Sequence, residues 1–84
     1  MDRDELLKLI GEQTLLSEER HQLNAQRAHQ QADLLRRYNE ITASHGTPRW
    51  LEGTQQLLVD LHATQVRMVE LEVRINELRR LTGR

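Results

Sequence analysis

The chain of 84 residues contains no cysteine and no phenylalanine, and it has one tryptophan, one tyrosine and one proline. The absence of cysteine excludes disulfide bonds and thiolate metal sites. The scarcity of aromatic residues removes the side chains that bury the most area from any core. Chains this small usually need disulfides, a metal or association for stability, so association becomes the expected solution.

An excess of charge of one sign is also missing. Twelve Lys and Arg residues face thirteen Asp and Glu residues, for a net charge of -1. This balance excludes a basic nucleic-acid arm and an acidic tail. No apolar run approaches the roughly 18 residues that span a bilayer, and the acidic start Met1–Glu5 lacks the features of a secretory signal. We therefore expect a cytoplasmic protein without a membrane partner.

The only proline lies in the sequence Gly46-Thr47-Pro48, between two long amphipathic segments. Glycine suits the position after a helix, threonine is a good N-cap, and proline fits the first position of the next helix. The sequence therefore predicts one domain over 1–84, with helices at about 3–44 and 48–82 and a turn at 45–48. Such a short joint favours an antiparallel hairpin. Asp2 and Glu5 have the spacing of a capping box at the start of the first helix.

The second helix carries an unbroken four-three heptad pattern, which is typical of a coiled coil. Its members, which we predict to form the intrachain seam, are Leu57, Leu61, Thr64, Met68, Leu71, Ile75, Leu78 and Thr82. On the first helix, apolar residues recur at Leu9, Leu16 and Leu23 and again at Leu34 and Ile41.

A row of small residues forms a second stripe on the first helix, comprising Ala25, Ala28, Ala32 and Leu35. Small side chains would allow another helix to approach closely. Alanine is also the best helix former on a solvated face, and the sequence leaves both interpretations open.

Folding the chain at Gly46 pairs positions whose numbers sum to about 92. In this register hydrophobic and charged residues match at the same time, which favours it. The expected pairs are Leu23 with Val69, Ala28 with Thr64, Arg20 with Glu72, Glu18 with Arg74, and Glu12 with Arg80.

The second helix has more apolar residues than one partner helix can cover. Between 57 and 81, 13 of 25 residues are apolar, against 8 of 25 between 17 and 41, so an apolar stripe outside the seam is left without a partner. Such a patch marks an interaction surface. We expect this interface to comprise Val59, Ala63, Val66, Val69 and Val73, and its simplest partner to be a second copy that completes a four-helix bundle.

Two motifs were weighed as sites for chemistry. Glu18 and His21 have the Glu-x-x-His spacing of di-metal sites in helical bundles, but both lie off the seam, where a solvated face is expected. His29 and Asp33 supply too few ligands for a closed metal site. No Ser or Cys nucleophile pattern surrounds the histidines. The sequence therefore predicts no metal, no cofactor and no enzymatic activity.

Arginines gather near both ends of the predicted hairpin, as Arg36, Arg37 and Arg49 at the tip and Arg74, Arg79, Arg80 and Arg84 at the open end. These clusters support an alternative function, a dimeric helical nucleic-acid-binding or regulatory protein that uses these arginines. Interleaved acidic residues weaken a continuous positive field, and stacking aromatics are missing. The favoured hypothesis is an all-α hairpin that acts as a non-enzymatic interaction, scaffolding or assembly module, as a homo-oligomer or as a small subunit of a larger complex.

Overall fold

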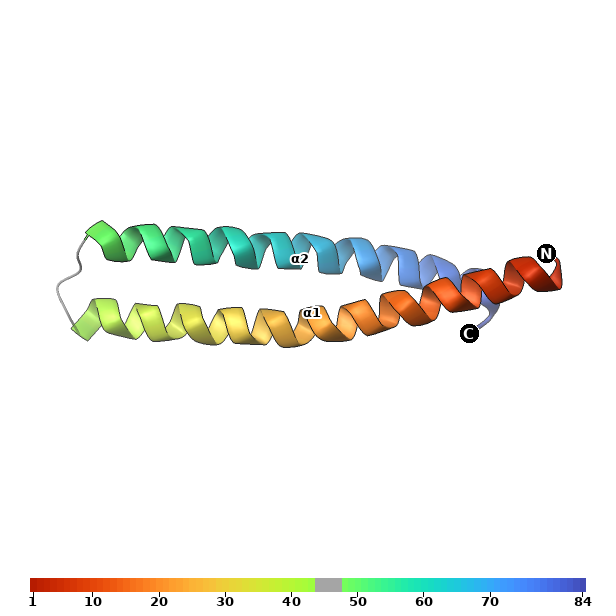
Figure 1. Ribbon diagram of the computed structural model, residues 1–84, viewed down its shortest axis with the longest axis horizontal. Coiled ribbons are helices and arrows are strands. Elements are labelled where there is room, and N and C mark those ends of the chain that lie inside the picture. Colours follow the sequence, from red (N-terminus) through yellow and green to blue (C-terminus); the bar gives the residue numbers. More distant parts are fainter. Residues whose placement is uncertain (44–47) are drawn as a thin grey trace.

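The computed structural model consists of two long helices, α1 (Arg3–Ala43) and α2 (Pro48–Thr82). It describes the backbone of residues 1–43 and 48–84 and the side chains of residues 1–40 and 53–84. The two helices lie side by side and antiparallel, so that both termini meet at the same end (Figure 1). The predicted all-α hairpin is confirmed. The turn signal at Gly46 and Thr47 lies outside the described residues.

Local signals set the outer helix ends. The Oδ1 atom of Asp2 accepts a hydrogen bond of 2.8 Å from the backbone N–H of Glu5, which is one half of the predicted capping box. At the other end Gly83 adopts a φ of 71°, and its N–H donates to the carbonyl of Arg79 at 2.9 Å. A left-handed residue in this place is costly for any side chain, so glycine ends α2 here.

The seam residues of α2 form the only fully buried part of the described chain. Leu71, Ile75 and Leu78 are at most 1% exposed, and Thr64 is 4% exposed. Leu57, Leu61 and Met68 are half-buried. In heptad terms, Leu61, Met68 and Ile75 occupy a positions, and Thr64, Leu71 and Leu78 occupy d positions. The best packing therefore lies toward the open end of the hairpin.

The matching seam of α1 alternates apolar and polar residues. Its spacing of three and four is unbroken, and every member is half-buried. The members are Leu6, Leu9, Gln13, Leu16, Arg20, Leu23, Arg27, Gln30, Leu34 and Arg37. The predicted recurrence of leucines identified one row of this seam and Leu34. The side chain of Ile41 lies outside the described residues.

Only some of the residue pairs predicted across the hairpin are found in the structure. Arg20 donates to Glu72 at 3.0 Å, as expected. Arg74, however, binds Glu12 instead of Glu18, and Glu12 is therefore not the partner of Arg80. These predicted pairs were wrong because residues that flank the seam of an antiparallel pair do not bind the residue directly opposite. The partner of Arg74 lies six positions before the expected Glu18.

Two hydrophobic pairs of the predicted register were also wrong. Leu23 lies in the seam, but Val69 is 64% exposed and points away from it. Ala28 is exposed, and the hydroxyl of Thr64 instead accepts a hydrogen bond of 3.4 Å from the side-chain amide of Gln26. A helix turns about 100° per residue, so a match in residue number alone does not place two side chains face to face.

Candidate interaction surfaces

The predicted valine interface lies on the outside of the hairpin. Val59, Val66 and Val73 repeat every seven residues and form one row along α2, at the f positions of the heptad. We call these three residues the valine row. They are 60%, 43% and 64% exposed, respectively. Of the other two predicted interface residues, Ala63 is exposed on one flank of this row and Val69 on the other. The row thus faces away from α1.

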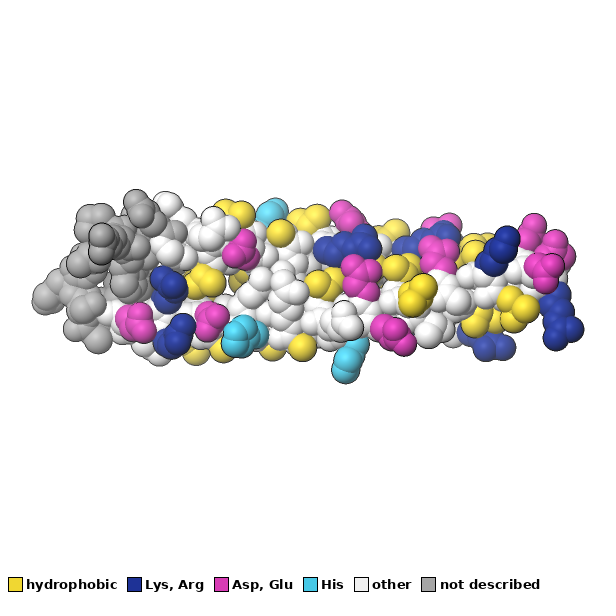
Figure 2. Space-filling view, viewed as in Figure 1, with side chains coloured by type: hydrophobic (Ala, Val, Ile, Leu, Met, Phe, Trp, Pro, Cys, Tyr) yellow, Lys and Arg dark blue, Asp and Glu magenta, His cyan; other side chains and the backbone are white. Residues whose placement is uncertain are grey.

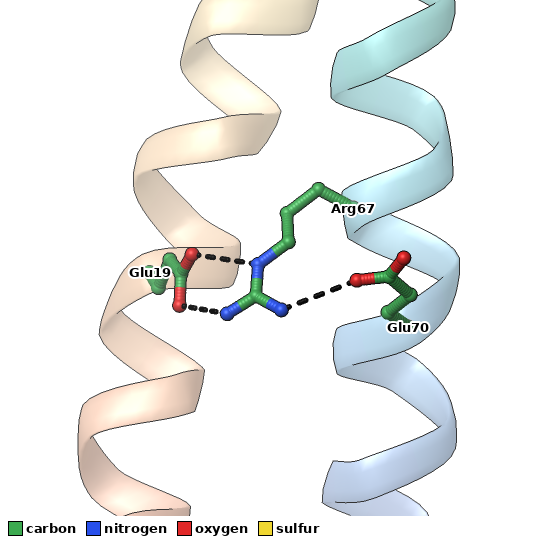
Figure 3. A network of polar contacts seen from close by, with 3 residues as sticks. All are labelled: Glu19, Arg67 and Glu70. Atoms are coloured by element: carbon green, nitrogen blue, oxygen red, sulfur yellow. Dashed lines mark hydrogen bonds and ion pairs between the residues drawn. The ribbon is translucent and has the colours of Figure 1, made fainter.

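One broad side of the hairpin carries a series of ion pairs across the two helices. Arg67 donates from Nε and Nη2 to the carboxylate of Glu19 at 3.0 and 3.1 Å, and from Nη1 to Glu70 at 3.3 Å. Figure 3 shows the guanidinium between its two carboxylates, one from each helix. These hydrogen bonds, first to Glu19 and then to Glu70, raise the pKa of Arg67.

A second network of the same form lies one heptad further along. Arg74 donates to Glu12 at 2.7 and 2.9 Å, and its Nη1 atom lies 2.9 Å from Glu77. The hydrogen bonds from Arg74 lower the pKa of Glu12 against the opposing effect of burial. Bonds to Glu12, and next to Glu77, raise the pKa of Arg74. Each of the two arginines therefore remains charged and donates hydrogen bonds to two carboxylates.

We call this side the ion-pair face. It comprises the g and c positions of both helices, where Leu6, Gln13 and Arg20 of α1 are a positions and Leu9, Leu16 and Leu23 are d positions. On α1 its members are Glu5, Lys8, Glu12, Leu15, Glu19, Gln22, Gln26, His29, Asp33, Arg36 and Glu40, and on α2 they are Gln56, Asp60, Ala63, Arg67, Glu70, Arg74, Glu77 and Leu81. Near the tip, Asp33 lies 3.4 Å from Arg36 and 3.7 Å from the Nε2 atom of His29. Figure 2 shows acidic and basic side chains intermingled along the face turned to the viewer. Such a surface is well solvated, and each exposed pair contributes only about 0 to 1 kcal/mol to stability.

The e and b positions form a face of the opposite character, which we call the low-charge face. On α1 its members contain no Asp, Glu, Lys or Arg, and they are Leu7, Ile10, Thr14, Ser17, His21, Asn24, Ala28, Gln31, Leu35 and Tyr38. On α2 they are Gln55, Leu58, His62, Gln65, Val69, Glu72, Asn76 and Arg79. Glu72 is already paired with Arg20 of the same hairpin, so the face presents little free charge.

Exposed large hydrophobic side chains concentrate on the low-charge face and the adjoining valine row. Leu7, Leu35 and Tyr38 of α1 are 57–61% exposed there. On α2, Leu58 is 49% exposed and Val69 is 64% exposed. Among the described residues, the exceptions are Met1, Leu15 and Leu81. The hairpin therefore has one charged side and one side that is poorly suited to water.

Two open grooves cut into the surface of the hairpin, and the first of them lies in the low-charge face. One, of about 620 Å³, runs between the helices and is lined by Asn24, Arg27, Gln65, Met68, Val69, Glu72, Val73 and Asn76. The other, of about 560 Å³, follows α1 and is lined by Ile10, Gln13, Thr14, Ser17, Glu18, His21, Gln22 and Arg84. Both are open to solvent and are not enclosed cavities, which suits the side chains of another helix better than a compact small molecule.

The arginine clusters are not continuous positive surfaces. Arg74 is engaged by two glutamates, and Arg36 lies 3.4 Å from Asp33. Arg37 belongs to the seam, and its guanidinium packs against Gly53 so closely that it occupies the space a Cβ atom at position 53 would need. Arg79, Arg80 and Arg84 are exposed at the open end. The side chain of Arg49 lies outside the described residues.

Of the candidate metal ligands, Glu18, His21 and His29 are exposed and Asp33 is half-buried. Glu18 and His21 are both exposed and line the groove along α1. Within residues 1–40 and 53–84, no three His, Asp or Glu side chains form a group that could hold a metal ion.

Comparisons of the chain with protein-family models, curated proteins and solved structures found no match. Neither helix, over the described residues, is both long and apolar enough to cross a membrane. The interaction surfaces therefore have to be interpreted from their own geometry.

Sequence reasoning found the valine row but missed the low-charge face. The row is visible as a seven-residue repeat of one residue type. The low-charge face contains mixed residue types, and its signal is the lack of Asp, Glu, Lys and Arg at alternating spacings of three and four from Leu7 to Tyr38. That pattern becomes visible only when the seam of α1 is correctly placed. Because the seam of α1 contains glutamines and arginines, a search for apolar residues does not find it.

Proposed function

We propose that this protein is a non-enzymatic interaction and assembly module, acting as a homo-oligomer or as a small subunit of a larger complex. The observation that carries the proposal is the valine row, whose members are 43–64% exposed on the outer side of α2. Exposed β-branched side chains at regular heptad spacing favour packing against another helix. A hairpin whose fully buried apolar residues in the described part are Leu71, Ile75 and Leu78 also has little core of its own.

The valine row lies at the f positions, about 170° around the helix from the seam. A partner docked there would extend the layer of helices at its edge. Its flanks are Ala63, which leaves room for close approach, and Val69. This arrangement supports a scaffolding role, in which α2 offers one edge to its own hairpin and the other to a partner.

The test is a single charge at the centre of the row. Val66→Glu leaves the seam untouched but places a carboxylate where a partner would have to desolvate it. We expect the mass in solution, measured by light scattering after gel filtration, to be higher for the wild type than for this variant at equal concentration. Leu15→Glu, a similar change on the ion-pair face, is the control and should retain the wild-type mass. Equal masses for the wild type and Val66→Glu would contradict a homo-oligomer formed through the valine row, and the row would then have to bind a different chain.

A further inference from the structure

We infer that the low-charge face, which is a different surface from the valine row, binds the same face of a second copy of this chain. The inference rests on the proposed assembly role, but it concerns another contact and can fail separately. The product would be a four-helix bundle with both ion-pair faces turned outward. The valine rows would then lie at its two edges, available for further contacts.

The position of the face around the helices fits this geometry. At about 100° per residue, the e and b rows lie about 100° from the seam of the same helix. In a four-helix bundle each helix contacts two neighbours on faces roughly at right angles to each other. The valine row, nearly opposite the seam, cannot fill the centre of such a bundle. The low-charge face can.

Charge argues for a second copy as the occupant. A face that meets its own copy across a two-fold axis brings every charge near an identical set, so an isologous contact favours few free charges. The α1 half of the face has none of Asp, Glu, Lys or Arg over residues 7–38. In the α2 half, Glu72 is neutralised by Arg20 at 3.0 Å. The remaining charged residue of the face is Arg79, which is exposed at the open end, so a strongly basic or acidic partner would find little complementary charge there.

The size of the face is also appropriate. The hairpin measures 63 × 15 × 15 Å, so one long side has a projected area of about 900 Å², which is of the order of the roughly 800 Å² of accessible surface that each partner buries in a standard stable interface. The groove between the helices, at about 620 Å³, runs within this face and is bordered by Val69 and Val73. It can receive side chains such as Leu35, Tyr38 or Leu58 of the other copy, which are 49–61% exposed in the hairpin.

The first experiment compares two matched double substitutions in the full chain. Asn24→Glu with Gln31→Glu adds two charges to the low-charge face. Both positions lie three or four residues from Arg20 or Arg27 of the same helix, which favours the helix, while Asn24 shares the groove with Glu72, so folding of the variant is measured as well. Gln22→Glu with His29→Glu adds two charges to the ion-pair face, near acidic neighbours, and costs the hairpin at least as much. Mass in solution and helical circular dichroism are measured for both.

We expect the wild type to have a higher mass than the Asn24/Gln31 variant, and the Gln22/His29 variant to keep the mass of the wild type. In a Val66→Glu background, which removes the valine-row contact, we expect a dimer of twice 9.9 kDa that becomes a monomer when Asn24→Glu and Gln31→Glu are added. A monomeric Val66→Glu chain, an unchanged mass when Asn24→Glu and Gln31→Glu are added to it, or an equal loss in the control would each overturn the inference. Retention of the dimer in Val66→Glu with no change in mass at all would instead contradict the valine-row proposal and leave this inference standing.

A second measurement does not depend on disrupting the contact. The chain has no native cysteine, so Gln31→Cys and Gln22→Cys each give one thiol, on the low-charge face and the ion-pair face respectively. We expect the thiol at 31 to react with a maleimide several-fold more slowly than the thiol at 22, with the difference vanishing on dilution to the monomer. Equal rates at all concentrations would overturn the inference.

Discussion

At the scale of single residues, three side chains carry most of the packing. Leu71, Ile75 and Leu78 are at most 1% exposed, whereas other apolar seam residues of the described chain are only half-buried. Removing methyl groups from a site that cannot collapse leaves a cavity as well as losing transfer free energy. The stability of the hairpin therefore depends on a few positions near its open end.

Leu71→Ala should accordingly destabilise the protein by roughly 2 to 5 kcal/mol, a large part of the total stability of a small domain. Leu15→Ala is the matched control, because Leu15 is 67% exposed on the ion-pair face, and its effect should not exceed about 0.5 kcal/mol. Thermal and urea unfolding followed by circular dichroism measure both. Similar losses at the two positions would show that the buried seam is misplaced.

The Glu12–Arg74 pair predicts a defined pH dependence. The pKa of Glu12 is lowered from its ordinary 4.5 in the folded chain, so the pair stabilises the folded state fully above that ordinary value. The stabilisation is lost as pH falls through the lowered pKa of the folded state. Because the Glu12 side chain is 39% exposed, the effect at neutral pH is at most about 1 kcal/mol.

Unfolding curves of the wild type and of Glu12→Gln should therefore differ at pH 7 and converge in strong acid. In an Arg74→Gln background the same change at Glu12 should give no pH-dependent difference, since the partner is already absent. A wild-type advantage that stays constant from neutral pH into strong acid would contradict the assignment of the pair.

At the scale of the helices, the two seams are unequal. The seam of α2 is apolar apart from threonines, while that of α1 places Gln13, Arg20, Arg27, Gln30 and Arg37 between leucines. Long side chains cover part of the seam with their apolar stems and carry their polar ends to its edge. The tip half of the hairpin, from Leu23 and Leu61 toward the turn, consequently has no fully buried apolar side chain among the described residues.

Hydrogen exchange should report this difference along α2. We expect amides between 71 and 78 to be the slowest, and those between 54 and 61 to exchange about tenfold faster or more after correction for intrinsic rates, because segments with little buried apolar area open locally. Uniform protection along α2, or slower exchange between 54 and 61, would contradict the unequal packing.

Gln30 offers a test of the polar seam itself. Its Oε1 atom is buried and accepts no hydrogen bond from the described residues, and such an atom costs about 1 to 3 kcal/mol. Gln30→Leu should thus raise the free energy of unfolding by about 1 kcal/mol or more. Gln22→Leu, at an exposed position, should have little effect. A loss of stability in Gln30→Leu would mean that Gln30 makes a polar contact in solution.

The polar seam also explains how much of the fold the sequence predicts. The helix ends follow from Asp2 and Gly83, and the seam of α2 follows from unbroken heptad spacing. On α1 the same spacing passes through arginines and glutamines, so a search for apolar residues finds Leu9, Leu16 and Leu23 and then loses the pattern. The pair between Arg74 and Glu12 could not be predicted, because it depends on which residues flank the seam of α1. Those residues are known only once that seam is correctly placed.

At the scale of the whole molecule, the hairpin is a rod with three different exposed surfaces. The ion-pair face is well solvated, the valine row is the proposed contact for a helix docked at the edge, and the low-charge face is the proposed contact with a second copy. The exposed valines could be predicted from composition, since α2 has more apolar residues than one partner covers. The contrast between the two broad faces could not, because it depends on which side of the seam each charge lies.

The central claim is that this hairpin completes its packing by association. The most direct test is the mass of the unmodified chain in solution, measured by sedimentation equilibrium across the micromolar range. The account predicts a species of at least twice 9.9 kDa that dissociates on dilution, as mass action requires for a folded state stabilised by a partner. A stable, fully helical species of 9.9 kDa at every concentration would contradict it.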